Sequence, residues 1–197
     1  KQDQQTGISL ILGVAAEKTP HVDEEIQAVA TLLPKPKVFS GANATEAALR
    51  ENGPNSRFIH IATHGYFRQD QPMFSGIRLG DTFLTLYDLY SLKLPASHVT
   101  LSGCSTGLTA VVAGDEIMGL TRGLLFAGAR DLLLTLWDVN DSSTAKFMKS
   151  FYASAVEHQD PALALQNAIQ QLRKQYPHPY YWAPFVLVGG GVASRPI

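Results

Sequence analysis

The sequence has one cysteine, no long apolar run and almost no net charge. Cys104 is the single cysteine among 197 residues, so no disulfide can form within the chain. We recognise no signal peptide and no run of about 18 apolar residues that could cross a membrane. With 16 basic and 17 acidic residues, the formal net charge is −1, so nucleic acid has no basic surface to bind. We expect a cytoplasmic protein that binds neither membranes nor nucleic acid directly.

The length and composition fit one domain over residues 1–197. Hydrophobic residues make up 45% of the chain, enough to bury a full core, whereas two ordinary domains would each be short. The chain begins with Lys1 rather than methionine, and Gln2 to Thr6 is polar without a pattern. We expect this domain to be the C-terminal part of a longer chain, with a regulatory region upstream.

Apolar runs of strand length alternate with segments of helical periodicity. The expected strands are Ile8 to Ala15, Val38-Phe39, Arg57 to Thr63, Val99 to Leu101, Asp131 to Trp137 and Phe185 to Val188. Such alternation predicts an α/β fold with a mostly parallel sheet and helices on both faces.

Two features interrupt or shape this alternation. Gly76 to Leu86 is typical of a small hairpin that turns at Gly80-Asp81, inserted between two strands. In the expected helix from Asp115 to Ala127, small residues recur every four positions. This small-residue stripe predicts close packing of the helix against a neighbouring element.

Two strands end in reactive side chains beside small residues. The strand Phe58 to Thr63 is followed by His64-Gly65, and the strand through Leu101 is followed by Ser102-Gly103-Cys104. Because the carboxyl ends of neighbouring parallel strands meet at one edge, we expect His64 and Cys104 to face each other there.

Peptide hydrolysis by a thiol needs a thiolate, a group that moves protons and N–H donors for the oxyanion. Cys104 and His64 can fill the first two roles. The N–H groups of Gly65 and Cys104 are candidates for the oxyanion donors. The alternatives without catalysis are that Cys104 is a small buried core residue and that His64 is a histidine in a turn.

Two other chemistries overlap with this site. Gly103 to Gly107 also fits the nucleophile elbow of α/β-hydrolases, with Ser105 as nucleophile, Asp138 as the acid and His158 or His178 as the base. His60, His64 and Cys104 together could hold zinc, but they lack the usual ligand spacing. We expect no metal and no other cofactor.

Four ordered motifs make the chain resemble the CHAT domain family, which is caspase-like and related to separase. They are H-I-A-T-H-G from His60, L-S-G-C-S-T-G from Leu101, G-D-E-I-M-G-L from Gly114 and T-L-W-D-V-N-D from Thr135. The resemblance extends from about Ile8 to Gly189 and includes Y-W-A-P-F from Tyr181. It implies a caspase-haemoglobinase type of fold and a bacterial-type thiol protease, a hydrolase with a His64 and Cys104 dyad.

The resemblance also suggests where substrate binds. Caspases carry a Trp-Arg pair after the catalytic helix, and Trp137-Asp138 is the matching pair here. The reversed charge at Asp138 suggests a basic P1 residue, since a carboxylate pairs strongly with arginine. Ser102 and Gly103 complete the expected substrate-binding residues, although basic-specific relatives have an acid where Ser102 stands.

Regulation is expected to come from outside the domain. The segment from Gly107 to Gly114 is too short for the cleavable linker of executioner caspases, so we expect no maturation cut there. Such domains usually follow tetratricopeptide repeats, and a TPR-type or other regulatory region is the expected partner besides a protein substrate. The alternative function is a catalytically silent scaffold that binds other proteins.

Overall fold

A six-stranded sheet forms the centre of the molecule in the computed structural model, which describes residues 7–15, 22–66, 68, 70–95, 98–102, 119–137 and 141–189. In spatial order the strands are β2 (Pro36–Ser40), β1 (Ile8–Gly13), β3 (Ser56–Ala62), β7 (His98–Ser102), β8 (Asp131–Thr135) and β9 (Phe185–Gly189). All neighbours are parallel except β8 and β9. The predicted α/β class and mostly parallel sheet are confirmed.

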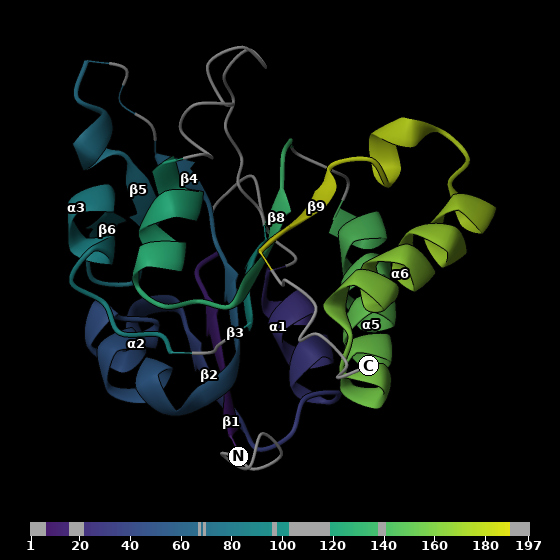
Figure 1. The fold of residues 1–197 in the computed structure, drawn as a ribbon, viewed down its shortest axis with the longest axis horizontal. Coiled ribbons are helices and arrows are strands. Elements are labelled where there is room, and N and C mark those ends of the chain that lie inside the picture. Colours follow the sequence, from purple (N-terminus) through teal and green to yellow (C-terminus); the bar gives the residue numbers. More distant parts are fainter. Residues whose placement is uncertain are drawn as a thin grey trace, which may run out of the picture.

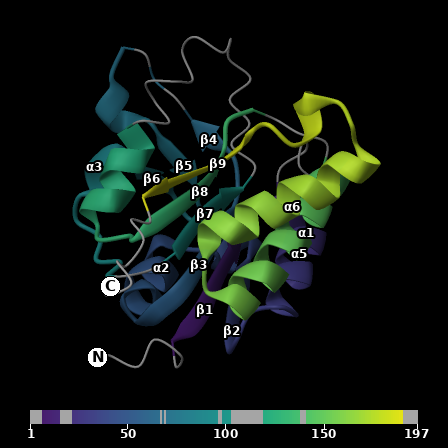
Figure 2. The same cartoon turned by 45° about the vertical axis from the view of Figure 1, so that its right-hand side comes forward.

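Helices cover both faces of the sheet, as predicted. One face carries α1 (Val22–Ala30), α5 (Asp141–His158) and α6 (Pro161–Gln175), which lie together in both ribbon views (Figure 1, Figure 2). The other carries α2 (Glu46–Asn52), α3 (Leu86–Leu89) and the helical residues 119–126. The carboxyl ends of the parallel strands point to the top of Figure 1.

Alternation along the strands divides the core into two layers. On β3, Ile59 and Ile61 pack with α2 and α3, whereas Phe58 and Ala62 pack with α1 and α5. Because both faces of the inner strands are covered, their residues are buried on both sides, including the polar residues His98, Thr100 and Ser102 of β7. The side chain of His60 on β3 is likewise fully buried, on the α5 side.

The predicted small-residue stripe does allow close packing. A methyl group added at Gly119 would lie 2.8 Å from Leu86, and one at Gly123 would lie 2.9 Å from Leu89. Both leucines belong to α3, so the glycines bring helix 119–126 directly against it. The rest of the expected helix, 115–118, lies outside the described residues.

A second, small sheet follows His64. It consists of the antiparallel strands β4 (Gly65–Tyr66), β5 (Gly76–Arg78) and β6 (Phe83–Thr85). The predicted hairpin is therefore confirmed as β5 and β6, and β4 extends it toward β3. Figure 1 shows this sheet at the upper left, near the carboxyl ends of the main strands.

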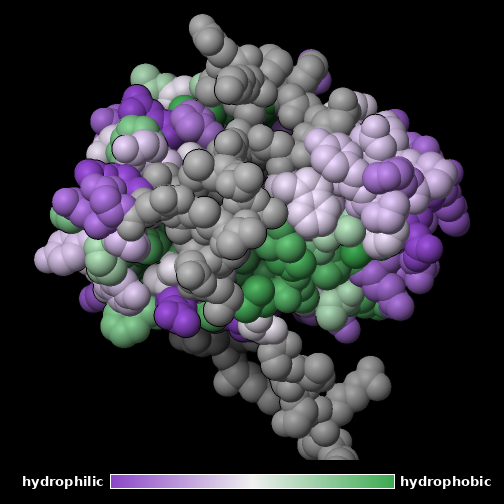
Figure 3. Space-filling model, turned by 90° about the horizontal axis from the view of Figure 1, so that it is seen from above, coloured by the Kyte–Doolittle hydropathy of each residue, from purple (hydrophilic) through white to green (hydrophobic). Residues whose placement is uncertain are grey.

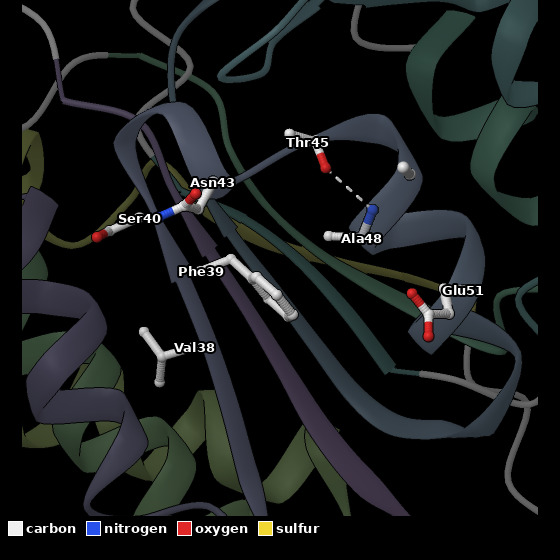
Figure 4. A pocket seen from close by; sticks show the side chains of 8 residues that line it. Val38, Phe39, Ser40, Asn43, Thr45, Ala48 and Glu51 are labelled. Atoms are coloured by element: carbon white, nitrogen blue, oxygen red, sulfur yellow. Dashed lines mark hydrogen bonds between the residues drawn. The ribbon is translucent and has the colours of Figure 1, made fainter.

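A shallow pocket of about 520 Å³ lies on the outer side of the edge strand β2. Phe39 and Ala48 form part of its apolar wall, and Thr45 accepts a hydrogen bond from the Ala48 N–H at the start of α2 (Figure 4). Strand β1 separates this pocket from β3. None of the residues that line it belongs to β3, β7 or the small sheet, so the pocket does not include His64.

Candidate active site

Strands β3 and β7 are direct neighbours and end at the same level. Ala62, the last residue of β3, pairs with Ser102, the last residue of β7. The next residue, Thr63, continues the ladder and donates its N–H to the Ser102 carbonyl at 3.0 Å. His64 therefore follows one strand end, and position 104 follows the other by two residues. Gly103 and Cys104 themselves lie outside the described residues.

The small sheet holds the backbone around His64. The Arg78 N–H donates to the His64 carbonyl at 3.0 Å, and the Thr63 hydroxyl donates to the Arg78 carbonyl at 2.7 Å. Both bonds join the end of β3 to β5. The backbone at His64 is therefore held by two sheets rather than by a free loop.

The environment of His64 favours its neutral form. Partial burial is the larger cause that lowers the pKa of the imidazole, and the positive charge of Arg78 lowers it further. Its Nδ1 atom is buried and has no hydrogen-bond partner within the described part of the chain. A neutral imidazole with an unengaged nitrogen can accept a proton.

Gly65 keeps its N–H free of the small sheet's ladder. Hydrogen-bonded and non-bonded pairs alternate in antiparallel sheets, and the bond from Arg78 makes its pair with His64 a bonded one. Gly65 is opposite Ile77, the next pair along, so its N–H points away from β5. The oxyanion role of Gly65 stays a prediction, with which this direction of its N–H is compatible.

Two buried hydroxyl groups lie unpaired at the same edge. Ser102 ends β7 and Thr135 ends β8, with exposed fractions of 1% and 4%. Neither hydroxyl oxygen has a hydrogen-bond partner among the residues described. Buried polar atoms are normally satisfied, so unpaired ones at strand ends indicate a place for a ligand or water. Ser102 is among the site residues predicted from the sequence, and Thr135 is not; for both, a role in the site stays a proposal.

Trp137 lies just beyond β8, at the same edge. It is 36% exposed, and its indole N–H donates to the Tyr180 carbonyl at 3.1 Å. This bond ties the turn after β8 to the short helix η4 (Pro179–Tyr181). Asp138, the proposed selector of a basic P1 residue, lies outside the described residues.

A buried polar network supports β3 and β7 from the α5 side. The Tyr152 hydroxyl donates to the Thr100 hydroxyl at 2.8 Å and lies 2.9 Å from His60 Nδ1. His60 Nε2 lies 3.2 Å from a Glu25 oxygen, close enough for an ion pair but outside hydrogen-bond geometry. Burial strongly raises the pKa of Tyr152, which keeps its phenol neutral. His60 therefore acts behind the site rather than in it.

The hydrolase alternative fits the described residues less well. His158 ends α5, which runs back from the top edge over 18 residues, so it lies at the opposite end of the sheet. His178 accepts a hydrogen bond from the Tyr180 N–H and thereby caps η4. Ser105 and Asp138 lie outside the described residues.

The described residues contain neither a cluster of metal ligands nor a membrane-spanning helix. No group of three or more His, Cys, Asp or Glu side chains there could hold a metal ion. No helix there is both long and apolar enough to span a membrane. Because Cys104 lies outside the described residues, the zinc alternative with His60 and His64 remains a prediction.

Residues 2–190 match the family model of the CHAT domain. The chain belongs to the CHAT domain family. Two related proteins are tetratricopeptide repeat protein 28 of Homo sapiens, 35% identical over 116 residues, and that of Mus musculus, 34% identical over 116 residues. Each alignment covers 58% of this chain and 5% of the relative. This CHAT domain thus spans about a twentieth of the length of these repeat proteins.

Solved structures share the fold of this CHAT domain. The match to the separase–securin complex of Saccharomyces cerevisiae covers 94% of this chain and 12% of the matched chain in that complex, with a TM-score of 0.63 and 17% identity. The match to the Arg-specific cysteine proteinase gingipain R covers 95% of this chain and 47% of the proteinase chain, with a TM-score of 0.66 and 10% identity. At such identities the likeness concerns the fold, which is caspase-like.

Proposed function

We propose that this CHAT domain is a cysteine endopeptidase in which Cys104 is the nucleophile and His64 moves protons. The observation that carries the proposal is the common end of β3 and β7, since His64 follows one strand and Cys104 follows the other in sequence. The caspase-like fold and the unpaired Nδ1 of His64 support it.

The proposed reaction proceeds in two steps. Neutral His64 takes the proton of the Cys104 thiol, and the thiolate attacks the scissile carbonyl carbon, so that a C–S bond forms and the negative charge moves to the oxygen. The N–H groups of Gly65 and Cys104 bind that oxygen. The C–N bond then breaks as protonated His64 gives its proton to the leaving amine. Water, deprotonated by His64, finally hydrolyses the thioester and restores the thiol.

Substrate recognition is proposed at the strand ends around the dyad. Ser102, Gly103, Trp137 and Asp138 are the residues proposed to contact substrate, and the unpaired Thr135 hydroxyl is added to them. A carboxylate at position 138 would pair with a basic P1 side chain. That gingipain R, of similar fold, is described as Arg specific supports this preference.

A peptide library varied at P1 tests both the proposed catalytic residues and the proposed P1 preference. Cleavage should occur after Arg or Lys, disappear in Cys104→Ala, persist in Ser105→Ala, and lose its P1 preference in Asp138→Ala. Loss in Ser105→Ala with Cys104 dispensable would instead establish the serine hydrolase. Binding of peptides without any cleavage would establish the catalytically silent scaffold.

Control of the peptidase is proposed to come from a region upstream of residue 1. The tetratricopeptide repeats in the names of both relatives support a TPR-type regulatory region, with a specific protein as substrate. The cytoplasm is the proposed location. No cut between Gly107 and Asp115 should be needed for activity.

A further inference from the structure

The outer face of the small sheet presents a row of side chains that begins at His64. In antiparallel sheets, residues directly opposite each other point to the same side. Gly65 pairs with Ile77 and Arg78 pairs with Phe83, so continuing the register sets His64 opposite Arg78. The row therefore consists of His64, which directly precedes β4, Arg78 of β5 and Phe83 of β6.

Aromatic rings line this face next to Arg78. The Arg78 guanidinium lies 5.0 Å from the centre of the Phe83 ring, and the Tyr66 ring lies 5.5 Å from the same ring. Tyr66 is opposite Gly76, which has no side chain, so Tyr66 is free to lean toward Phe83. Tyr66 and Phe83 are 49% and 37% exposed. The face is thus accessible to another chain.

Arg78 has no anionic partner among the described residues. The segment 65–89 contains three acidic side chains, and each is engaged elsewhere. Asp70 pairs with Arg68, Asp81 accepts from the Glu46 N–H, and Asp88 accepts from Thr85 in the capping box of α3. Stacking on Phe83 leaves the N–H donors of the guanidinium unused.

From this arrangement we infer that the face formed by His64, Tyr66, Arg78 and Phe83 binds the extended substrate chain, with Arg78 receiving an acidic side chain close to the scissile bond. The inference rests on the proposed function, because the row starts at the proposed proton-transfer residue. Neighbouring strands lie about 5 Å apart and an extended chain rises about 3.3 Å per residue, so the acid should lie one or two residues from the bond.

The charges favour this occupant over a basic or apolar segment. A carboxylate can form a bidentate pair with guanidinium, and the adjacent rings can cover its aliphatic stem. A basic side chain would be repelled. An acidic residue here and a basic P1 residue near Asp138 would together give the substrate a motif of opposite charges.

Peptide binding to the Cys104→Ala protein tests the inference without requiring turnover. The probe is a fluorescein-labelled decapeptide library in which Asp or Glu is exchanged for Asn or Gln at each position. Acidic peptides should bind about tenfold more tightly at one position, as expected for a charge-assisted bond. Arg78→Gln in this background should abolish that preference.

Two variants separate charge recognition from structural damage. Arg78→Glu keeps the backbone bond to His64 and should prefer Lys at the same position. Arg68→Gln removes a nearby arginine that is already paired and should change nothing. Retention of the acid preference in Arg78→Gln, or no acid preference at any position, would overturn the inference. Acid-dependent binding by a wild-type protein that cleaves nothing would refute the peptidase and support the inference.

Discussion

His64 is the single residue whose surroundings most directly determine its chemistry. Its carbonyl is held by the Arg78 N–H, its Nδ1 is buried, and a positive charge lies nearby. Burial and the Arg78 charge act in the same direction on its pKa. The imidazole therefore stays neutral at pH values where an exposed histidine begins to take up a proton.

Removal of the Arg78 charge should raise the pKa of His64. Arg78→Gln removes the charge while the backbone N–H of residue 78 still donates to the His64 carbonyl. NMR titration of the imidazole in the Cys104→Ala background should show a pKa below the ordinary histidine value, and a higher one in Arg78→Gln. Arg68→Gln serves as the control, because Asp70 neutralises Arg68. An unchanged pKa in Arg78→Gln would contradict this account.

The Tyr152 hydroxyl is expected to stabilise the protein from behind the site. Tyr152→Phe leaves the ring packing but removes the group between His60 and Thr100, so both lose a buried partner. The free energy of unfolding should fall by about 1–3 kcal/mol, measured by urea denaturation. Tyr87→Phe, at a ring that is 72% exposed, should change it by less than about 0.5 kcal/mol.

At this scale, sequence patterns single out some of the residues that we propose for the site but not others. His64 follows an apolar strand and precedes a glycine, so local reasoning could find it. Thr135 opens one of the four motifs, but no local pattern marks its hydroxyl as part of a site, and Arg78 lies within a hairpin. Their relevance depends on which strands are neighbours, and that is set by tertiary packing.

The small sheet is the element that joins the site to the substrate face. Strand β5 bonds to His64 through Arg78 on one side and pairs with β6 on the other. Gly76 is required in it, because an added methyl group would lie 2.2 Å from the Leu84 carbonyl oxygen. A backbone atom cannot move away as a flexible side chain can.

Gly76→Ala should therefore disrupt both stability and the proposed catalysis. Separation of β5 from β6 should cost about 1–3 kcal/mol of unfolding free energy and displace the His64 backbone. Gly119→Ala is the matched control, since its nearest contact is the end of the flexible Leu86 side chain. The measurements are urea denaturation and peptide cleavage. Equal effects of the two substitutions would contradict the structural assignment.

The positions of strands with a strong apolar pattern could be predicted from the sequence, whereas the direction in which neighbouring strands pair could not always be predicted. The sequence predicts strands at Arg57 to Thr63 and Phe185 to Val188, close to the observed β3 and β9. It does not predict that β9 runs antiparallel to β8, because both directions produce similar apolar runs. The hairpin turn at Gly80-Asp81 was recognisable because its turn residues are local.

On the scale of the whole molecule, the parallel strands bring polar groups to both ends of the sheet. The top edge carries His64, Ser102 and Thr135, and part of the described surface there is hydrophobic, beside hydrophilic margins (Figure 3). The opposite end carries a buried ion pair between His98 and Asp131, the first residues of β7 and β8. We therefore expect the bottom pair to contribute to stability, and the top edge is where we propose that substrate binds.

The Asp131 carboxylate should make stability depend on acid pH. Burial raises its pKa, but the hydrogen bond and charge of His98, together with Arg130, outweigh burial and leave the pKa below the usual value. A carboxyl with a lowered folded pKa stabilises the protein above its unfolded pKa of about 3.9, and that stability is lost as the pH falls.

Asp131→Asn should remove this acid dependence. At neutral pH the variant should lose about 3 kcal/mol of unfolding free energy, because a neutral amide replaces the buried carboxylate that pairs with His98 and Arg130. Between about pH 5 and pH 2 the wild type should lose more stability than the variant, as measured by urea denaturation at each pH. Parallel curves for the two proteins would assign the acid sensitivity to other groups.

The most direct measurement of the central claim is the intact mass of the protein after treatment with a peptide that carries an electrophilic warhead. The account predicts one adduct per chain, mapped by fragmentation to Cys104. It also predicts that His64→Ala forms the adduct at least tenfold more slowly, and that Ser105→Ala forms it at the wild-type rate. An adduct on Ser105, or equal labelling rates with and without the His64 imidazole, would contradict a dyad of His64 and Cys104.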